Sequence, residues 1–381
     1  MSLQELVDIS RYYGSNPEYV IAGGGNTSFK DGATLFVKGS GTSLGDIGAE
    51  GFVRMDRAKL AHIWEKQYPK DADEREAAVL ADMMAAKLPG EEYRTKSPQR
   101  PSVETLLHDI LPFAYVVHTH PALVNGLTCS QDGEGAAKAL FGEGCIWIPI
   151  TNPGYILSLV VKQALDTYLA RNGKPADIIF LQNHGVFVGA DSVEGIRAIY
   201  AKILSVLEKK ITRKPDFSGK TRLCRDSETI AQALAACAGQ NPKVVLEQNA
   251  EFARLTKTVA DFSPVSSAFT PDHIVYSGSD PLFITITDGD PLEDQIRDAW
   301  KGHLKKTGRP PKIAAVQGRG IFGIGASEKT ASLALELFTD TAKVAAYSES
   351  FGGPRFMTQD KIDFINNWEV ERYRSQVAEK P

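Results

Sequence analysis

Short runs of β-branched and aromatic residues alternate with longer amphipathic stretches along the first half of this sequence. Strands are predicted at 32–38, 114–118, 146–150 and 178–182, and helices at about 56–68, 73–88, 102–111, 155–171 and 192–211. This alternation is typical of an α/β domain in which layers of helices cover a sheet. The strands include both buried runs and alternating positions, so the pattern leaves a parallel and a mixed sheet open.

The length of 381 residues predicts two domains rather than one. Residues 212–226 are polar and basic, contain proline and glycine, and show no periodicity, which is typical of a linker. We therefore expect a first domain at 1–211 and a smaller C-terminal α/β domain at 227–381. The second domain is expected to contain helices near 227–238, 243–260, 328–345 and 359–376 and strands near 273–277, 282–286 and 313–317.

The two halves of the chain share a short internal similarity. Residues 181–189, LQNHGVFVG, resemble 316–324, VQGRGIFGI. A second, shorter similarity is that between 37–41, VKGSG, and 274–278, IVYSG. One interpretation makes the C-terminal domain a degenerate copy of the first, with Arg319 in the place of His184. The other is chance similarity between two glycine-rich turns, and a comparison of the two strand orders distinguishes them.

The charge balance excludes some classes of partner. Forty-three Lys and Arg against forty-seven Asp and Glu give a net charge of -4, so no broad basic field is available for nucleic acid or for an anionic membrane. The N-terminal residues lack the basic start and apolar core of a signal peptide, and no apolar run approaches the ~18 residues of a membrane span. A cytoplasmic location with no membrane partner is the resulting expectation.

Histidines are the candidate metal ligands, because the four cysteines show no C-x-x-C spacing. In 115–121, YVVHTHP, His118 and His120 are two apart on a predicted strand and therefore share a face. His184, in the NHG turn after the strand at 178–182, supplies a third imidazole. Three histidines with an open position are typical of a catalytic zinc site. Hydrogen-bonded histidines without a metal are the alternative that H-x-H spacing alone leaves open.

A carboxylate falls in the first turn of the helix predicted at 102–111. Ser102 is a good N-cap after Pro101, which places Glu104 in that turn. Beside a divalent cation this carboxylate would be stabilised in its ionised form and could transfer a proton. Alternatively it only complements the helix dipole. His108, one turn later, is expected to support the site or to pack rather than to bind metal.

Two glycine-rich loops contain the elements of an anion site. They are 22–28, AGGGNTS, and 38–43, KGSGTS. Backbone N–H groups, small polar side chains, a lysine and the helix start at Ser102 together can bind a phosphate or a carboxylate. Glycine-rich turns between strands are common, so the loops alone are weak evidence. The candidate binding residues are Asn26, Thr27, Lys38, Ser40, Gly41 and Ser102.

Residues 318–323 match G-x-G-x-x-G after the strand predicted at 313–317, a pattern found in dinucleotide-binding domains. The following residues 321–324, IFGI, indicate a strand where that motif requires a helix. No clear second strand ending in an acid follows ~20 residues on. A nicotinamide-dependent oxidoreductase is therefore a rival interpretation that the sequence disfavours.

Five motifs, taken in order, carry a family resemblance. GGGNTS at 23–28, KGSG at 38–41, PSVE at 101–104, HTHP at 118–121 and NHG at 183–185 resemble the class II aldolase/adducin family over residues 1 to about 211. The remainder of the chain resembles the region that follows the aldolase domain in bifunctional rhamnulose-1-phosphate aldolase/dehydrogenase proteins. The resemblance implies an α/β/α layered aldolase-like domain.

The same resemblance implies a metal-dependent aldolase that cleaves a ketose, such as a ketose 1-phosphate, through a metal-bound enediolate. Its cofactor would be Zn²⁺, with Mn²⁺ or Co²⁺ as alternatives, held by His118, His120 and His184. Glu104 would be the acid/base. Asn26, the loop of Ser40 and Gly41, and Ser102 would bind the phosphate.

Several alternatives stay open within this family. Sugar-phosphate epimerases, a dehydratase and sugar-acid decarboxylases use the same metal chemistry. Adducin-like scaffolds form a different, non-catalytic class, against which the presence of all three histidines and Glu104 argues. The expected partner is a small sugar or sugar phosphate, and the resemblance implies a homo-oligomer, a dimer or a tetramer.

Overall fold

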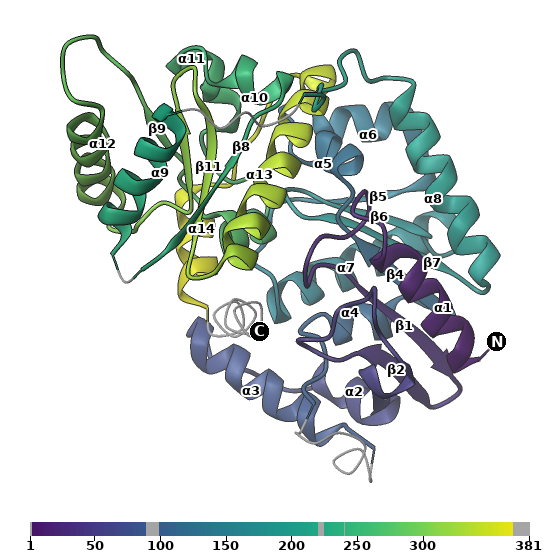
Figure 1. Cartoon of the computed structure of the whole chain (residues 1–381). Helices are drawn as coiled ribbons and strands as arrows, with labels where there is room; N and C mark the ends of the chain where they lie inside the picture. Colours follow the sequence, from purple (N-terminus) through teal and green to yellow (C-terminus); the bar gives the residue numbers. More distant parts are fainter. Residues whose placement is uncertain (1, 89–98, 220–224, 240, 369–381) are drawn as a thin grey trace. The chain divides into compact units, whose positions relative to one another are not determined.

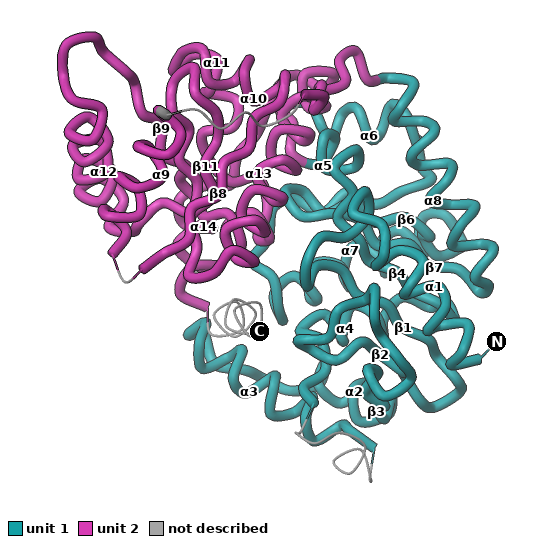
Figure 2. The backbone as a smooth tube through the Cα atoms, in the orientation of Figure 1, with its two compact units in different colours: residues 1–128, 132–210 teal, residues 129–131, 211–381 magenta. Residues whose placement is uncertain are grey.

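The computed structural model describes residues 2–88, 99–219, 225–239 and 241–368. The chain divides into two compact units (Figure 2). Unit 1 comprises residues 1–128 and 132–210, and unit 2 comprises residues 129–131 and 211–381. Residues 220–224 of the expected linker, with Cys224, and residues 369–376 of the last expected helix lie outside the described part of the chain.

Unit 1 is built around a seven-stranded sheet of order β3-β2-β1-β4-β7-β6-β5 (Figure 1). β5 and β6 run parallel, and the other neighbouring pairs are antiparallel, so the sheet is mixed. Its strands are β1 (Asn26–Asp31), β2 (Thr34–Lys38), β3 (Phe52–Asp56), β4 (Tyr115–Thr119), β5 (Ile146–Ile148), β6 (Ile178–Leu181) and β7 (Gly185–Ala190).

Helices cover both faces of this sheet. Thr27 of β1 bonds to Ser10 of α1 on one face, whereas its neighbour Ser28 bonds to His108 of α4 on the other, because successive strand residues point to opposite sides. The α/β/α layering expected from the sequence is confirmed. The helices of unit 1 are α1 (Leu3–Gly14), α2 (Arg57–Ile63), α3 (Ala72–Ala85), α4 (Thr105–Ile110), α5 (Ala122–Thr128), α6 (Gly133–Phe141), α7 (Tyr155–Asn172) and α8 (Val193–Glu208).

Local signals fix the ends of the long helices α7 and α8. Gly173 takes a left-handed conformation, with φ 68°, and ends α7. Ser192 begins α8, and its side chain accepts a hydrogen bond from the Gly195 amide. Buried α7 residues such as Val161 then pack against strand residues such as Ile179 in one hydrophobic cluster, which holds the helix on the sheet.

Unit 2 contains a separate four-stranded sheet of order β8-β11-β10-β9. β9 and β10 are parallel, and β10 to β11 and β11 to β8 are antiparallel. Trp300, Ile296 and Phe322 belong to its buried core. The strands are β8 (Lys243–Glu247), β9 (Leu282–Ile284), β10 (Ile313–Val316) and β11 (Gly320–Gly325). The main helices are α9 (Arg225–Ala238), α10 (Ala250–Leu255), α11 (Val259–Phe262), α12 (Leu292–Thr307), α13 (Glu328–Ser348) and α14 (Gln359–Asn367).

Two expectations for unit 2 are wrong in detail, and one of its helices was not expected. Residues 243–247 form strand β8 instead of the start of a helix, because they pair with β11. Residues 273–277 form a buried π-helical turn, η5 (His273–Ser277), instead of a strand; short, fully buried apolar runs do not distinguish the two. Helix α12 was not expected at all, since charged residues dominate it and leave only a narrow buried stripe.

The G-x-G-x-x-G run at 318–323 crosses the turn between β10 and β11 and continues into β11. The chain there begins a strand, not the helix whose N-terminus a dinucleotide motif requires. The strand expected at 321–324 is thus confirmed. Among the described helices, none has the length and apolar character needed to cross a membrane.

Candidate metal centre

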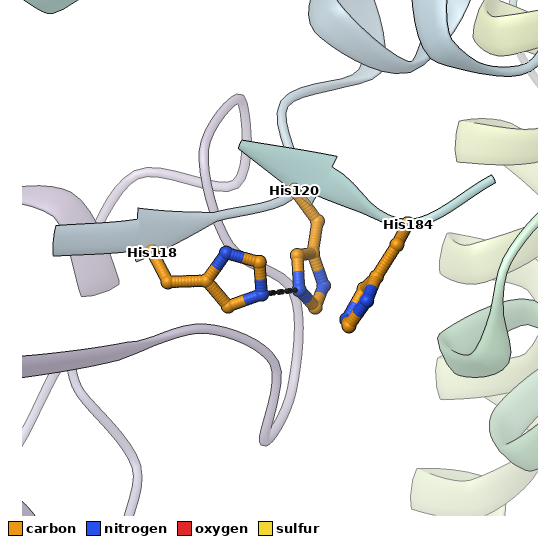
Figure 3. A group of neighbouring side chains, drawn as sticks. All are labelled: His118, His120 and His184. Atoms are coloured by element: carbon orange, nitrogen blue, oxygen red, sulfur yellow. Dashed lines mark hydrogen bonds between the residues drawn. The ribbon is translucent and has the colours of Figure 1, made fainter. Parts of the chain in front are cut away.

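His118, His120 and His184 converge in unit 1 (Figure 3). His118 lies in β4, His120 follows the end of that strand, and His184 lies in the turn between β6 and β7. One ring nitrogen of each lies within 4.8 Å of the others, and the Nε2 atoms of His118 and His120 are 2.9 Å apart. The histidines proposed from sequence as metal ligands therefore form a single cluster.

Sheet pairing brings these histidines together. β4 and β7 are antiparallel with His118 opposite Phe187, so the turn preceding β7 lies beside the end of β4. Asn183 takes a left-handed conformation, with φ 57°, which turns the chain at His184. A side chain at Gly185 would lie 2.5 Å from the Thr119 carbonyl oxygen, so glycine permits this close approach.

Backbone contacts orient the rings. His118 Nδ1 lies 2.9 Å from the Val186 carbonyl oxygen. A carbonyl oxygen only accepts, so Nδ1 carries the proton and Nε2 presents its lone pair to the cluster. The His118 ring also stacks on Phe187, with centroids 4.0 Å apart. The His120 amide donates to the Tyr19 carbonyl, 3.0 Å away, which anchors the chain just beyond the strand.

Glu104 lies beside the histidines and is buried. Its Oε1 atom lies 3.6 Å from His118 Nε2 and 3.7 Å from His184 Nε2, and it has no hydrogen-bond partner. Its Oε2 atom accepts a 2.5 Å hydrogen bond from the Asn26 side-chain amide. A buried carboxylate oxygen without a donor is costly, so this atom is suited to a cation, a water or a substrate group in the cluster.

These donors fit a divalent transition metal. Three clustered imidazoles, of which His118 directs its Nε2 lone pair at the cluster, match the ligand set of catalytic zinc, in which Zn–N distances are ~2.0–2.1 Å and one position is left open. The unpartnered Glu104 Oε1 borders the cluster. Imidazole nitrogens suit Zn²⁺, whereas Mn²⁺ prefers carboxylate, carbonyl and water oxygens.

The candidate anion-binding residues are brought only partly together. Residues 38–40 pair with residues 100–102 through their backbones. An isolated antiparallel β-bridge joins Gly39 to Pro101. On either side of it, the Ser40 amide donates to Arg100 O and the Ser102 amide donates to Lys38 O. The loop of Ser40 and Gly41 therefore lies along the segment that leads to Glu104. Ser102 Oγ in turn accepts from the Asn26 amide at 3.4 Å.

Two of the candidate residues are placed differently from expectation. Thr27 is fully buried on the opposite sheet face, where its hydroxyl lies 2.6 Å from Ser10 Oγ, so its side chain does not reach the site. Asn26 does reach the site, but its amide is bonded to Glu104, Ser102 and His108. Alternation along β1 explains the difference, since neighbouring residues point to opposite faces.

His108 takes a larger part in the site than packing alone. Its Nδ1 atom lies 2.7 Å from Ser28 Oγ, and its Nε2 atom bonds to Asn26 Oδ1. Burial lowers the pKa of His108 well below its usual value, so the ring is neutral. Ser28 was missed as a site residue, although its two-residue spacing from Asn26 on a strand predicts a shared face.

A family model matches almost all of unit 1. The model described as Class II Aldolase and Adducin N-terminal domain matches residues 4–208, more than half of the chain. The chain therefore belongs to the class II aldolase and adducin family, and the resemblance carried by its motifs is confirmed.

One curated relative matches nearly the whole chain. The protein called "Uncharacterized oxidoreductase YuxG", from Bacillus subtilis (strain 168), is 23% identical over 424 residues. The match covers 99% of this chain and 58% of the relative, so the chain spans little more than half of that protein's length.

Several solved structures each match a little more than half of this chain. The N-terminal class II aldolase domain of a conserved protein from Thermoplasma acidophilum is 27% identical, with a TM-score of 0.44, over 55% of this chain and 93% of that one. YgbL, a putative aldolase/epimerase/decarboxylase from Escherichia coli, is 16% identical, with a TM-score of 0.37, over 54% and 86%. An L-fuculose-1-phosphate aldolase from Thermus thermophilus is 15% identical, with a TM-score of 0.33, over 54% and 90%.

Proposed function

We propose that this protein is a metal-dependent carbon–carbon lyase that cleaves a ketose 1-phosphate by a retro-aldol reaction. The observation that carries the proposal is the unpartnered Oε1 atom of Glu104, which lies 3.6 Å and 3.7 Å from two of the three clustered imidazoles. A carboxylate at that distance from a three-histidine cluster can act on the carbon next to a group held by the cation. Membership of the class II aldolase and adducin family supports this chemistry.

His118, His120 and His184 would hold the divalent ion, Zn²⁺ in this proposal. Once bound, the ion would polarise the carbonyl of the substrate and so favour breaking of the adjacent carbon–carbon bond. As that bond breaks, the hydroxyl of the departing carbon would become the aldehyde carbonyl and release its proton to solvent, and Glu104 would return a proton to the carbon that keeps the electron pair. Its burial keeps bulk water from competing for this role.

The loop of Ser40 and Gly41, with Lys38 and Ser102, would bind the phosphate of the substrate. Backbone pairing between this loop and residues 100–102 supports the assignment, because it fixes the loop close to Glu104. Asn26 would hold the Glu104 carboxylate instead of binding the phosphate, since its side-chain amide already donates to Glu104 Oε2. A homo-oligomeric assembly belongs to the proposal, and light scattering at working concentration tests it.

The first experiment is metal analysis by mass spectrometry, followed by a cleavage screen. We expect about one divalent ion per chain and release of dihydroxyacetone phosphate from a ketose 1-phosphate such as L-fuculose 1-phosphate or L-rhamnulose 1-phosphate. Formation of an epimer without a three-carbon product would replace the aldolase assignment with an epimerase. A well-folded protein that takes up no ion after addition of Zn²⁺, Mn²⁺ and Co²⁺ would overturn the proposal.

A further inference from the structure

A chain of hydrogen bonds runs from Ser28 through His108 and Asn26 to Glu104. Ser28 Oγ lies 2.7 Å from His108 Nδ1, His108 Nε2 bonds to Asn26 Oδ1, and Asn26 Nδ2 lies 2.5 Å from Glu104 Oε2. All four residues are buried. Asn26 and Ser28 lie in β1, His108 lies in α4, and Glu104 directly precedes α4. The Glu104 carboxylate is therefore held by a network in which Ser28 lies two residues after Asn26 and His108 lies four residues after Glu104.

The chemistry of each group fixes the direction of this chain. An ionised carboxylate only accepts, so the Asn26 NH₂ group faces Glu104 and the Asn26 carbonyl faces His108. That carbonyl also only accepts, so His108 Nε2 carries the proton. A neutral ring has a single N–H, so His108 Nδ1 accepts the hydroxyl proton of Ser28. One tautomer of His108 satisfies every partner.

We propose that His108 is a positioning residue: it holds the Asn26 amide with its NH₂ group toward Glu104 and thereby fixes the free Oε1 atom of Glu104 at the metal centre. If the amide turned by 180°, two oxygens would face each other and the carboxylate would lose its anchor. The inference rests on the proposed function, since it assigns a task within that same site.

The kinetic test measures the exchange of a carbon-bound proton of dihydroxyacetone phosphate for deuterium in D₂O. Proton NMR follows the loss of that proton's signal. In His108→Leu the donor to Asn26 is lost, and we expect kcat for exchange to fall about 100-fold, the scale of a 1 Å misplacement, with KM changed less than about threefold. His108→Gln retains an N–H donor and should recover most of the loss. Metal content should stay at one ion per chain in both variants.

A double-mutant cycle tests whether His108 acts through Asn26. In an Asn26→Ala background the His108→Leu change should cause no further loss of kcat, because the intermediate group is already absent. Additive losses in the double variant would overturn the proposal. An equal loss in His108→Gln and His108→Leu would do the same, since it would indicate a packing role.

A spectroscopic test separates this proposal from the proposed function. Nitrogen-15 NMR of the imidazole groups in the wild-type protein should give the Nε2–H tautomer for His108, assigned by comparison with His108→Gln. This result holds even if no tested substrate is turned over, in which case only the proposed function fails. An Nδ1–H tautomer would overturn the positioning role whatever the activity.

A second inference comes from the sheet of unit 2, which repeats part of the sheet of unit 1. The order β4-β7-β6-β5 corresponds to β8-β11-β10-β9, and the pair directions agree: antiparallel, antiparallel, parallel. This is the agreement of strand order that distinguishes a copy from a chance similarity of two turns.

Individual hydrogen bonds repeat as well. The Gln182 amide donates to Ile148 O and its side chain accepts from the Ile150 amide. Gln317 makes the same two bonds, to Ile284 O and from the Ile286 amide.

The turns after β6 and β10 also correspond. Asn183, with φ 57°, donates to Thr128 O, and Gly318, with φ 65°, donates to Thr256 O.

The strand register identifies the residues at the metal-ligand positions. His118 pairs with Phe187, and Leu246 pairs with Phe322, so Leu246 is equivalent to His118. The same offset places Gln248 at the position of His120. The turn alignment places Arg319 at the position of His184, and Arg319 Nε lies 3.3 Å from Asp226 Oδ2 of α9.

We infer that unit 2 is a degenerate copy of the metal-site framework, in which Leu246, Gln248 and Arg319 replace the three ligands. Each chain would then hold a single ion, and the Arg319 guanidinium would supply the local positive charge beside Asp226. Close approach at the turn is kept: a side chain at Gly320 would lie 3.0 Å from Glu247 O, and one at Gly185 would lie 2.5 Å from Thr119 O.

The test restores the histidines. In a His118→Ala background, which empties the first site, the changes Leu246→His, Gln248→His and Arg319→His should together recover one Zn²⁺ per chain. A folded variant that binds none would contradict the inference. If that variant does not fold, the wild-type protein decides: one ion, lost in His118→Ala, supports the inference, and an ion that persists in His118→Ala overturns it.

Discussion

Glu104 Oε1 lies 3.6 Å from His118 Nε2, although Glu104 directly precedes helix α4 and His118 lies near the end of strand β4. The opposite oxygen of the same carboxylate is held by Asn26. One oxygen is thus anchored while the other borders the cluster of ring nitrogens. We therefore expect Oε1 to be the oxygen of Glu104 that transfers a proton.

Glu104→Gln should remove proton transfer while leaving the metal centre assembled. Glutamine keeps the size of the side chain but cannot exchange a proton, so we expect kcat to fall by about 10²–10⁴. Deuterium exchange into dihydroxyacetone phosphate measures the loss, and metal analysis provides the control. Unchanged exchange in a metal-loaded variant would remove Glu104 from the mechanism.

His118→Ala should abolish metal binding, because it deletes the most deeply buried ligand of the cluster. The matched control is His62→Ala, since His62 is exposed on α2 and pairs with Glu65. Thermal unfolding with and without EDTA should differ for the wild type and for His62→Ala, and coincide for His118→Ala, because bound metal stabilises only the folded state. An EDTA effect that survives in His118→Ala would contradict the assignment.

Gly185→Ala should disturb the metal centre through the backbone. The added methyl group would lie 2.5 Å from Thr119 O and 2.7 Å from His120 Cδ2. We expect a loss of about 1–3 kcal/mol in the free energy of unfolding and weaker metal binding. Gly135→Ala in α6 is the control, since nothing lies within 4 Å of the new carbon. If the two variants had equal free energies of unfolding and equal metal binding, the close backbone approach at Gly185 would have no role in the site.

Thr27→Val should affect stability but not substrate binding. Ser10 uses its only hydroxyl proton on Leu6 O, so Thr27 donates to Ser10. Losing this buried hydrogen bond should cost about 1 kcal/mol in denaturant unfolding. KM for the exchange reaction should stay at the wild-type value. A raised KM with unchanged stability would restore Thr27 as a binding residue.

Acid should destabilise the metal-free protein partly through His108. Burial lowers the pKa of His108 well below its usual value, and electrostatic interactions with Lys30, His118 and Lys38 act in the same direction. The unfolded chain, with a histidine pKa of ~6.5, therefore takes up a proton before the folded chain does. Stability is lost as the pH falls below ~6.5, by up to ~1.4 kcal/mol per pH unit from this residue.

Urea unfolding of wild type and His108→Gln at pH 7 and pH 5 measures this contribution. The variant should show the shallower dependence on pH, because it lacks the group that is protonated only on unfolding. Identical slopes for the two proteins would mean that His108 gains its proton equally in both states.

The sequence alone predicted the α/β class, the family and the three histidines that cluster in unit 1. These are short-range or chemical signals. His118 and His120 share a face because a strand has a period of two, and His184 follows a strand at a turn that contains a glycine. Glu104 was identified from a helix start expected at Ser102, although α4 begins three residues later, at Thr105, and Glu104 directly precedes it.

Only the tertiary structure decided on which face of the sheet each side chain of β1 lies and which residues it contacts there. Thr27 was expected to bind phosphate, yet its hydroxyl bonds to Ser10 of α1, 17 residues earlier, while Asn26 meets Glu104, 78 residues later. Likewise, 243–247 became a strand because β11 supplies the partner that the segment itself does not specify. Local patterns encode period and turn, whereas sheet pairing and buried hydrogen bonds join residues far apart in the chain, so neither can be inferred from the neighbours of a residue in sequence.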